Sequence, residues 1–245
     1  MLKNSPDLSA WLQRYVITCL PIDCCAMSGH FITIEGGEGS GKTTQIRLLM
    51  DAFSHTSIAT FSTREPGGTE SAEILRNLLL QGDENKWDAI SETLLFYAAR
   101  REHMVHVVWP AMKEGTTVIC DRFHDSTRAY QGFAKCLGDD FVMQLHRLVI
   151  GNFLPDLTLW LDINAEKGLE RAISRPDEKE LRFESIQDGF HDRVRLGFET
   201  LAENESKRIV RINANHSITK VHEAIIHALN HHLDLQLIPQ QEAKI

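Results

Sequence analysis

The sequence predicts an α/β fold in which a five-stranded parallel sheet lies between two layers of helices and carries a lid at one edge. Short β-rich runs alternate with helical patterns along the 245 residues. Strands that alternate with helices are joined by right-handed crossovers and pair in parallel. A glycine-rich motif also follows the first strand, at the carboxyl edge where such sheets bind ligands.

Each predicted strand is a short run rich in β-branched and aromatic residues, and each predicted helix is a longer amphipathic segment. We expect strands at 31–35, 58–63, 117–120, 157–162 and 208–212. The main helices are expected at 43–54, 71–81, 88–108, 139–150, 185–203 and 218–232. No repeat or linker interrupts the chain after residue 29, so the pattern fits one domain over 29–245.

The N-terminal segment 1–28 precedes the first strand and carries no motif, so we expect a non-catalytic extension. Its apolar stretch at 15–20 is too short for a signal peptide and is followed by Pro21. Met27 stands just before the first strand, and we hypothesise that translation starts there.

The composition argues against several classes of protein. A net charge of −8 disfavours general nucleic-acid binding, because neutralising phosphates requires excess lysine and arginine. No apolar run is long enough to predict a membrane span. The five cysteines contain no C-x-x-C pair, so we expect reduced thiols and a cytoplasmic protein.

The strongest motif is G-x-x-x-x-G-K-T, from Gly36 to Thr43, between a predicted strand and a predicted helix. Its glycines let backbone N–H groups converge on phosphates, and the helix adds its positive N-terminal end. Lys42 is expected to reach the terminal phosphates, and the Thr43 hydroxyl to ligate Mg²⁺. We therefore expect a nucleoside triphosphate at Gly36, Gly37, Glu38, Gly39, Ser40, Gly41, Lys42, Thr43 and Thr44.

Two further motifs indicate an acceptor pocket. In T-R-E-P-G-G-T, at 63–69, a rigid turn presents Arg64 for a phosphate and Glu65 for a hydroxyl group. In L-L-F-Y-A-A-R-R, Phe96 and Arg100 are four residues apart and share one helical face. An aromatic ring for stacking beside a guanidinium donor is typical of a nucleobase pocket.

The third strand is followed by D-R-F-H-D-S-T-R-A-Y-Q-G. Asp121 stands where a strand-end carboxylate can hold Mg²⁺ through water, and Arg122 can bind a phosphate with two hydrogen bonds. The residues that recur at helical spacing and can line a base and sugar pocket are Thr127, Tyr130 and Gln131. A charged, proline-containing segment at about 171–184 has the character of a lid that closes over phosphates.

Together these motifs resemble thymidylate kinase, the bacterial dTMP kinase. The resemblance rests on G-G-E-G-S-G-K-T-T, T-R-E-P-G-G-T, L-F-Y-A-A-R, D-R-x-x-x-S-T-x-A-Y-Q-G and P-D-L-T-L-W-L-D, in family order over about residues 29–232. It implies the three-layer sandwich of P-loop NTPases. It also implies phosphorylation of dTMP to dTDP by ATP with Mg²⁺, a step of dTTP biosynthesis.

The resemblance implies a role for each residue of the acceptor pocket. Phe96 would stack on thymine and Arg100 would donate to its O4, while Thr127 and Gln131 would help to read the base edge. Tyr130 would pack against the sugar C2′ and disfavour a 2′-hydroxyl. At the phosphate end, Glu38 would orient the acceptor side, and the groups that hold the dTMP phosphate would be Arg64 and Arg122.

The resemblance also implies a catalytic arginine in the lid. Some relatives carry this arginine inside the P-loop, but residues 36–41 contain no basic residue here, so the lid must supply it. Arg175 aligns best with the family position, and Arg171 and Arg182 are the alternatives. Relatives are generally homodimers, and the apolar residues at 105–109 fit either an interface or the core.

Two other functions remain open from the sequence. One is a kinase for a different acceptor, such as another nucleoside monophosphate or a deoxynucleoside. The other is a non-catalytic nucleotide-binding paralogue, against which the intact Lys42, Thr43 and Arg122 argue. Release of ADP with a panel of monophosphates would separate these functions.

Overall fold

The computed structural model describes residues 27–173, 182–183, 186 and 189–239, so most of the predicted N-terminal extension and most of the predicted lid lie outside the described residues. Within them, five parallel strands form one sheet with the order β2-β3-β1-β4-β5. The strands are β1 (Phe31–Glu35), β2 (Thr60–Arg64), β3 (Thr117–Asp121), β4 (Leu157–Asp162) and β5 (Ile209–Asn213). The predicted five-stranded parallel sheet is confirmed.

Helices connect successive strands and cover both faces of the sheet. They are α2 (Lys42–Ser54), α3 (Glu70–Leu80), α4 (Ala89–His103), α5 (Trp109–Lys113), α6 (His124–Thr127), α7 (Asp139–Val149), α8 (Ala165–Ile173), α9 (Phe190–Asn204) and α10 (Ile218–Leu233), with π-helical turns η2 (Met104–Val108) and η3 (Arg128–Ala134). Side-chain caps fix where three of the helices begin. The side chains of Thr69, Asp88 and Ser217 accept hydrogen bonds from backbone N–H groups in the first turns of α3, α4 and α10.

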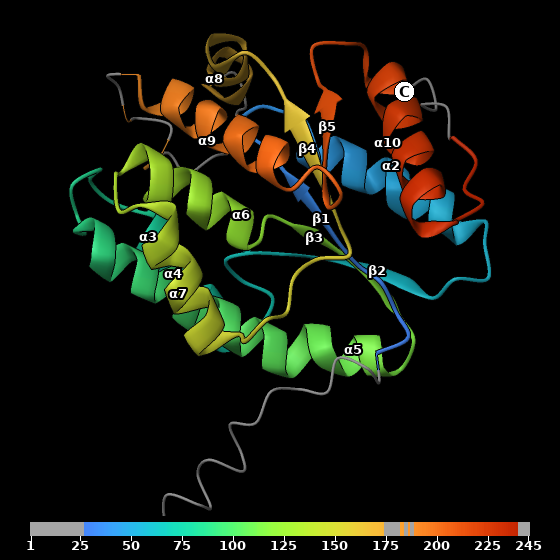
Figure 1. The fold of residues 1–245 in the computed structure, drawn as a ribbon, viewed down its shortest axis with the longest axis horizontal. Coiled ribbons are helices and arrows are strands. Elements are labelled where there is room, and N and C mark those ends of the chain that lie inside the picture. Colours follow the sequence, from blue (N-terminus) through green and yellow to red (C-terminus); the bar gives the residue numbers. More distant parts are fainter. Residues whose placement is uncertain (1–26, 174–181, 184–185, 187–188, 240–245) are drawn as a thin grey trace, which may run out of the picture.

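The three layers are visible in Figure 1, where α2 and α10 lie on one face of the sheet and α4, α7 and α9 on the other. The central strand β1 shows why both faces are covered. Its Ile32 and Ile34 pack with α2 and α10, whereas Phe31 packs in the opposite cluster with Trp109 and Phe153. Successive strand residues point to opposite faces, so a fully buried strand needs helices on both sides.

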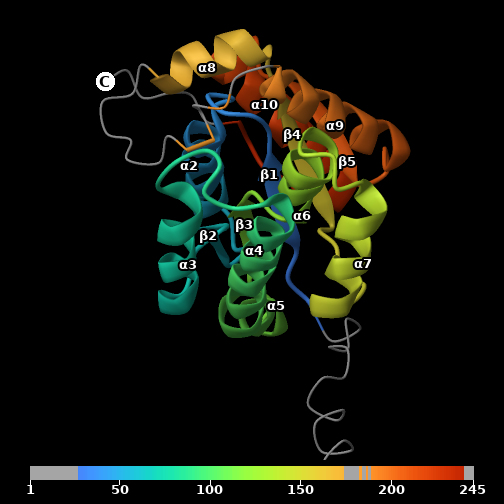
Figure 2. The ribbon, with the colours of Figure 1, turned by 90° about the vertical axis from the view of Figure 1, so that its left-hand side faces the viewer.

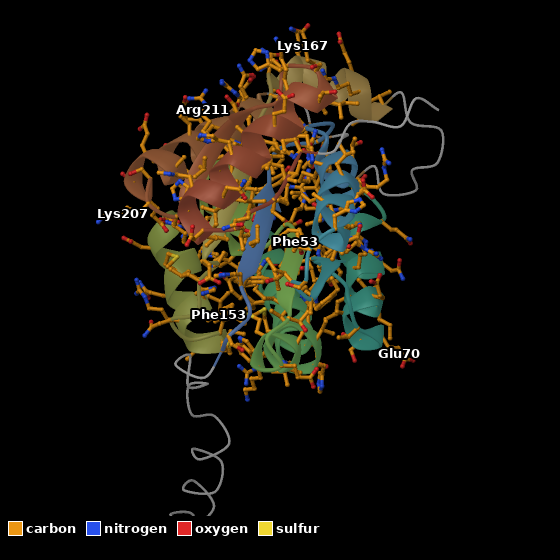
Figure 3. All side chains as sticks on the ribbon, turned by 90° about the vertical axis from the view of Figure 1, so that its right-hand side faces the viewer. Phe53, Glu70, Phe153, Lys167, Lys207 and Arg211 are labelled. Carbon is orange, nitrogen blue, oxygen red and sulfur yellow. The ribbon has the colours of Figure 1, made fainter. Side chains whose placement is uncertain are left out.

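The order of the strands determines where the site forms. β1 lies between β3 and β4, with β2 outside β3. The chain runs from β1 past β3 to β2, returns to β3, and then crosses β1 to reach β4 on the other side. The loops after β1, β2 and β3 therefore meet at one carboxyl edge, where the direction of the connections changes. Helix α8 lies across that end of the molecule (Figure 2). In Figure 3, Lys167 of α8 marks this end, Phe53 of α2 lies in the interior, and Phe153 lies toward the opposite end.

The helical boundaries differ from the sequence pattern in two regions. The helix expected at 88–108 is α4, which widens into η2 and continues as α5 to Lys113. Its apolar Val108 and Trp109 are buried, so they belong to the core and not to an exposed interface. The helix expected at 185–203 begins only at Phe190 in α9. None of the helices described here is long and apolar enough to cross a membrane.

Candidate active site

The loop after β1 folds as the sequence motif predicts. Helix α2 begins at Lys42, directly after Gly41, whose φ of 93° lies in the left-handed region that favours glycine. The Lys42 ammonium donates to the carbonyl oxygens of Gly36 and Gly37, at 3.2 and 3.1 Å. Burial, with the nearby Arg122, lowers the pKa of Lys42 to about 8. The loop thus holds its lysine across the helix N-terminus, where phosphates bind.

Helix α8 packs directly on this loop through two glycines. A Cβ atom on Gly39 would lie 2.0 Å from the carbonyl oxygen of Gly168, and one on Gly168 would lie 2.5 Å from that of Glu38. Neither contact leaves room for a side chain. Helix α8, whose last residues 171–173 begin the predicted lid segment, is therefore held against the P-loop by backbone contact.

A cavity of about 410 Å³ opens in front of the loop. Its lining includes nearly all of the predicted site residues: Glu38, Gly39, Ser40, Gly41, Lys42, Thr43, Arg64, Glu65, Phe96, Arg100, Asp121, Arg122, Thr127, Tyr130 and Gln131. The predicted residues Gly36, Gly37 and Thr44 do not line it. Arg175 lies outside the described residues.

Arg122 and Glu38 form the centre of the phosphate end. The Arg122 backbone has φ of 65°, an uncommon conformation for a residue with a side chain. Its guanidinium donates to Glu38 Oε1 at 3.0 Å and to the Gly36 carbonyl at 2.9 Å. The Tyr130 hydroxyl also donates to Glu38, at 2.7 and 2.8 Å. Burial alone would raise the pKa of Glu38, but Arg122, with hydrogen bonds from His191 and Tyr130, holds it well below its usual value.

Arg100 is fixed at the other end of the cavity. Its Nε donates to Glu65 Oε2 at 2.7 Å, and its Nη2 donates to the Thr127 hydroxyl at 3.1 Å. The guanidinium also lies over the rings of Tyr97 and Phe123, at 4.7 and 5.0 Å from their centroids. The remaining nitrogen, Nη1, is buried without a hydrogen-bond partner in the described part of the chain. A buried donor of this kind needs an acceptor, which a ligand in the cavity can supply.

Glu65 is held by two partners at once. Its Oε1 lies 2.9 Å from His103 Nδ1, and His103 Nε2 lies 2.8 Å from the Thr63 hydroxyl. Burial would raise the pKa of Glu65, but Arg100 and His103 lower it. The atoms of Glu65, His103 and Cys120 are close enough for a metal ion, yet Glu65 and His103 already bind each other and Arg100. We interpret this group as a hydrogen-bond chain that supports Arg100.

The predicted metal ligands are chemically suitable for Mg²⁺. Thr43 and Asp121 line the same cavity, and Asp121 Oδ1 is buried with no hydrogen-bond partner among the described residues. A carboxylate and a hydroxyl provide the hard oxygen ligands that Mg²⁺ prefers. The orphaned oxygen is the structural sign that a cation fits here.

Two arginines have partners that the sequence did not indicate. Arg64 pairs with both carboxylate oxygens of Glu73 at 3.0 Å, on a part of the cavity wall that is open to solvent. Arg182 is buried, and it donates to the carbonyl oxygens of Leu79, Asp83 and Glu84. Its guanidinium therefore holds the connection between α3 and α4.

Sequence reasoning did not identify several residues that shape the cavity. The residues missed are Pro66, Arg76, Leu80, Phe123, Ser126 and Phe183, which line it, and Glu35, which lies behind it. Glu35 accepts hydrogen bonds from the Phe123 and Ser126 backbones and from the Ser126 hydroxyl. The one signal available was its position, an acidic residue ending an otherwise buried strand.

Comparison with known proteins agrees with this geometry. The family model described as thymidylate kinase matches residues 34–225. A thymidylate kinase of Clostridium novyi is 46% identical over 198 residues, covering 80% of this chain and 96% of the relative. One of Caulobacter vibrioides is 45% identical over 197 residues, covering 80% and 94%.

A solved structure also matches the fold. The crystal structure of thymidylate kinase from Ehrlichia chaffeensis superposes with a TM-score of 0.66 at 36% identity, covering 83% of this chain and 99% of that one. The P-loop and the acceptor cavity lie within the region that the family model matches. The chain therefore belongs to the thymidylate kinase family, and its reaction is the phosphorylation of dTMP.

Proposed function

We propose that the chain transfers the γ-phosphoryl group of ATP to dTMP, with ATP on the P-loop and dTMP in the cavity. The observation that carries this proposal is that one cavity joins the P-loop to the unpaired donor of Arg100. Lys42 marks the phosphate end, and Arg100 marks the base end. An acceptor with a phosphate at one end and a base carbonyl at the other satisfies both.

The base end of the cavity suits a pyrimidine. Arg100 Nη1 donates to O4, Phe96 stacks on the ring, and Thr127 and Gln131 read the base edge in this proposal. Tyr130 lies against the sugar and leaves no room for a 2′-hydroxyl. The tight fixing of Arg100 supports this assignment, because a preorganised donor loses little freedom on binding.

The phosphate end supplies positive charge. Arg64 and Arg122 would hold the dTMP phosphate, and Lys42 would contact the phosphates of ATP, whose charge grows during transfer. Mg²⁺, held by Thr43 and Asp121, would neutralise phosphate charge when bound. Glu38 positions Arg122 through their 3.0 Å ion pair, which supports its role on the acceptor side.

The catalytic arginine is proposed to be Arg175. Arg182 is engaged with three backbone carbonyls, which makes it a support for the loop between α3 and α4. We also propose that the chain is a cytoplasmic homodimer. Apolar side chains exposed on the neighbouring helices α3 and α4 support this pairing: Ile74, Leu78, Ile90 and Leu94.

A coupled assay of ADP release tests the substrate assignment. The purified chain is given ATP, Mg²⁺ and, one at a time, dTMP, dUMP, dCMP, dGMP, dAMP and thymidine. Turnover highest with dTMP is the expected result. Highest turnover with thymidine would assign a nucleoside kinase, and no turnover with any acceptor would assign a non-catalytic nucleotide-binding protein.

A further inference from the structure

Gln131 carries a carboxamide that can present either a donor or an acceptor to the base. It lines the cavity from η3 and is 1% exposed. Its Nε2 lies 2.9 Å from Glu92 Oε1. A carboxylate only accepts hydrogen bonds, so it binds the amide through the NH₂ group. The acceptor end, Oε1, is then the end left for a ligand.

The Glu92 carboxylate that binds the Gln131 amide is itself held in place by other side chains. Its side chain is fully buried on α4 and contacts two cations, Lys135 Nζ at 2.8 Å and Arg182 Nη1 at 2.6 Å. Both cations are donors, as is the Gln131 amide, so the carboxylate accepts from each of these neighbours. Arg182 is itself held by the backbone carbonyls of Leu79, Asp83 and Glu84, so the carboxylate is supported from behind.

We propose that Glu92 is a positioning residue for base specificity, because it fixes the Gln131 amide with its acceptor end toward the base. This inference rests on the proposed placement of dTMP. Arg100 then offers a donor and Gln131 an acceptor. Thymine presents the complementary pattern, an O4 acceptor beside an N3–H donor. Cytosine presents the reverse pattern, an amino donor beside an N3 acceptor.

The test compares two acceptors that share the 5-methyl group and differ only at this edge, dTMP and 5-methyl-dCMP. The measured quantity is the ratio of their kcat/KM values. Glu92→Gln frees the Gln131 amide to turn, because a glutamine can meet either of its ends. We expect the ratio to fall at least tenfold through a rise in the KM for dTMP, with the KM for ATP unchanged.

A double-mutant cycle shows whether Glu92 acts through Gln131. Gln131→Ala should lower the ratio alone, and adding Glu92→Gln to it should change the ratio no further. The matched control is Lys135→Met, which removes another partner of the same carboxylate but lies outside the cavity lining. The kcat/KM ratio of this variant should stay within threefold of the ratio of the unmodified protein. If Glu92→Gln fails to fold, the charge-balanced Glu92→Gln/Lys135→Met variant carries the same test.

The outcomes separate this inference from the proposed function. An unmodified protein that does not prefer dTMP over 5-methyl-dCMP overturns the base assignment itself. A preference that Gln131→Ala abolishes but Glu92→Gln leaves intact overturns only the role of Glu92. An equal fall of the kcat/KM ratio in Glu92→Gln and Lys135→Met also overturns it, because both variants would then disturb the buried charged cluster in the same way.

Discussion

At the scale of single residues, the site is built from side chains that hold one another before they hold a ligand. Arg100 is bonded to Glu65 and Thr127 and lies over two aromatic rings, and Nη1 is the guanidinium nitrogen left without a partner among the described residues. Because the side chain is already ordered in the folded protein, ligand binding does not carry the entropy cost of ordering it. Each substitution should therefore mainly affect how the protein binds the part of the substrate that the residue faces.

Arg100→Ala should raise the KM for dTMP far more than the KM for ATP. A hydrogen bond to a charged donor is worth about 1.5–3 kcal/mol, or roughly a tenfold to a hundredfold change. Steady-state kinetics with each substrate varied in turn gives both constants. The matched control is Arg101→Ala, since Arg101 bonds the Val149 carbonyl away from the cavity. A change confined to ATP would place the base elsewhere.

Tyr130→Ala and Tyr130→Phe should behave differently toward ribonucleotides. The ring is 6% exposed and bonds Glu38 through its hydroxyl. Removing the ring should relax the preference for dTMP over ribo-TMP by about 1–3 kcal/mol, the cost of burying an unpaired hydroxyl. Removing only the hydroxyl should keep that preference. The kcat/KM ratio measures this, and an unchanged ratio in Tyr130→Ala removes the ring from the sugar site.

Arg175→Ala should lower turnover on the order of 10³-fold with little change in either KM, since an arginine finger acts in the transition state. The comparison variants are Arg171→Ala and Arg182→Ala. Because Arg182 binds three backbone carbonyls, its loss should lower the thermal midpoint along with activity. Full turnover in all three variants would show that the lid carries no catalytic arginine.

At the scale of elements, the contact between α8 and the P-loop connects the lid segment to the phosphate site. The two backbones approach through Gly39 and Gly168, with no space for a Cβ atom on either. Glycine in a helix costs about 1 kcal/mol relative to alanine, so its presence in α8 is explained by packing and not by helix formation. The element gives up helical stability for this contact.

Gly168→Ala tests this balance. If only helix propensity mattered, the variant would be more stable by about 1 kcal/mol. We expect the reverse, because the new Cβ would lie 2.5 Å from the Glu38 carbonyl and push α8 from the loop. The free energy of unfolding, measured with denaturant, should fall, and the KM for ATP should rise. Lys167→Ala, at an exposed position of the same helix, should change neither. A stabilised Gly168→Ala would disprove the contact.

At the scale of the whole molecule, the strand order brings distant segments into one buried network. β1 and β3 are neighbours, so Glu35 at the end of β1 accepts hydrogen bonds from Phe123 and Ser126 after β3, across a sequence separation of 88 residues for the first. Burial, followed by the charge of Asp125, raises the pKa of Glu35 to about 7. A raised pKa in the folded state makes stability depend on pH.

The stabilising contribution of Glu35 falls as the pH rises. The unfolded chain releases this proton near its usual pKa of 4.5, while the folded chain keeps it until about pH 7. The contribution is therefore fully present below pH 4.5 and lost as pH rises through 7. Glu35→Gln cannot ionise and does not lose this contribution. As the pH rises from 4.5 to 7, its free energy of unfolding should therefore increase by about 3 kcal/mol relative to that of the unmodified protein. Denaturant unfolding across pH measures the difference.

The control for this experiment is Glu114→Gln, which removes an exposed carboxylate. Its free energy of unfolding should follow that of the unmodified protein at every pH. If Glu35→Gln also follows it in parallel, Glu35 does not carry the raised pKa.

The sequence predicted the sheet and the P-loop well because their signals are local. A buried strand needs consecutive apolar residues, and the phosphate loop needs glycines and a lysine at fixed spacing. β1 and β4 were placed at their observed boundaries for this reason. The same locality explains the misplaced start of α9, since the charged residues before Phe190 also fit a helical pattern.

The sequence by itself determined which chemical groups reach the carboxyl edge, including Lys42, Arg100, Arg122 and Gln131. Only the tertiary structure decided their partners, such as Glu65 and His103 behind Arg100, Glu92 behind Gln131, and Glu35 behind the loop after β3. The physical reason is that hydrogen-bond partners are chosen by which strands and helices become neighbours. That choice depends on packing the whole core, which no local pattern contains.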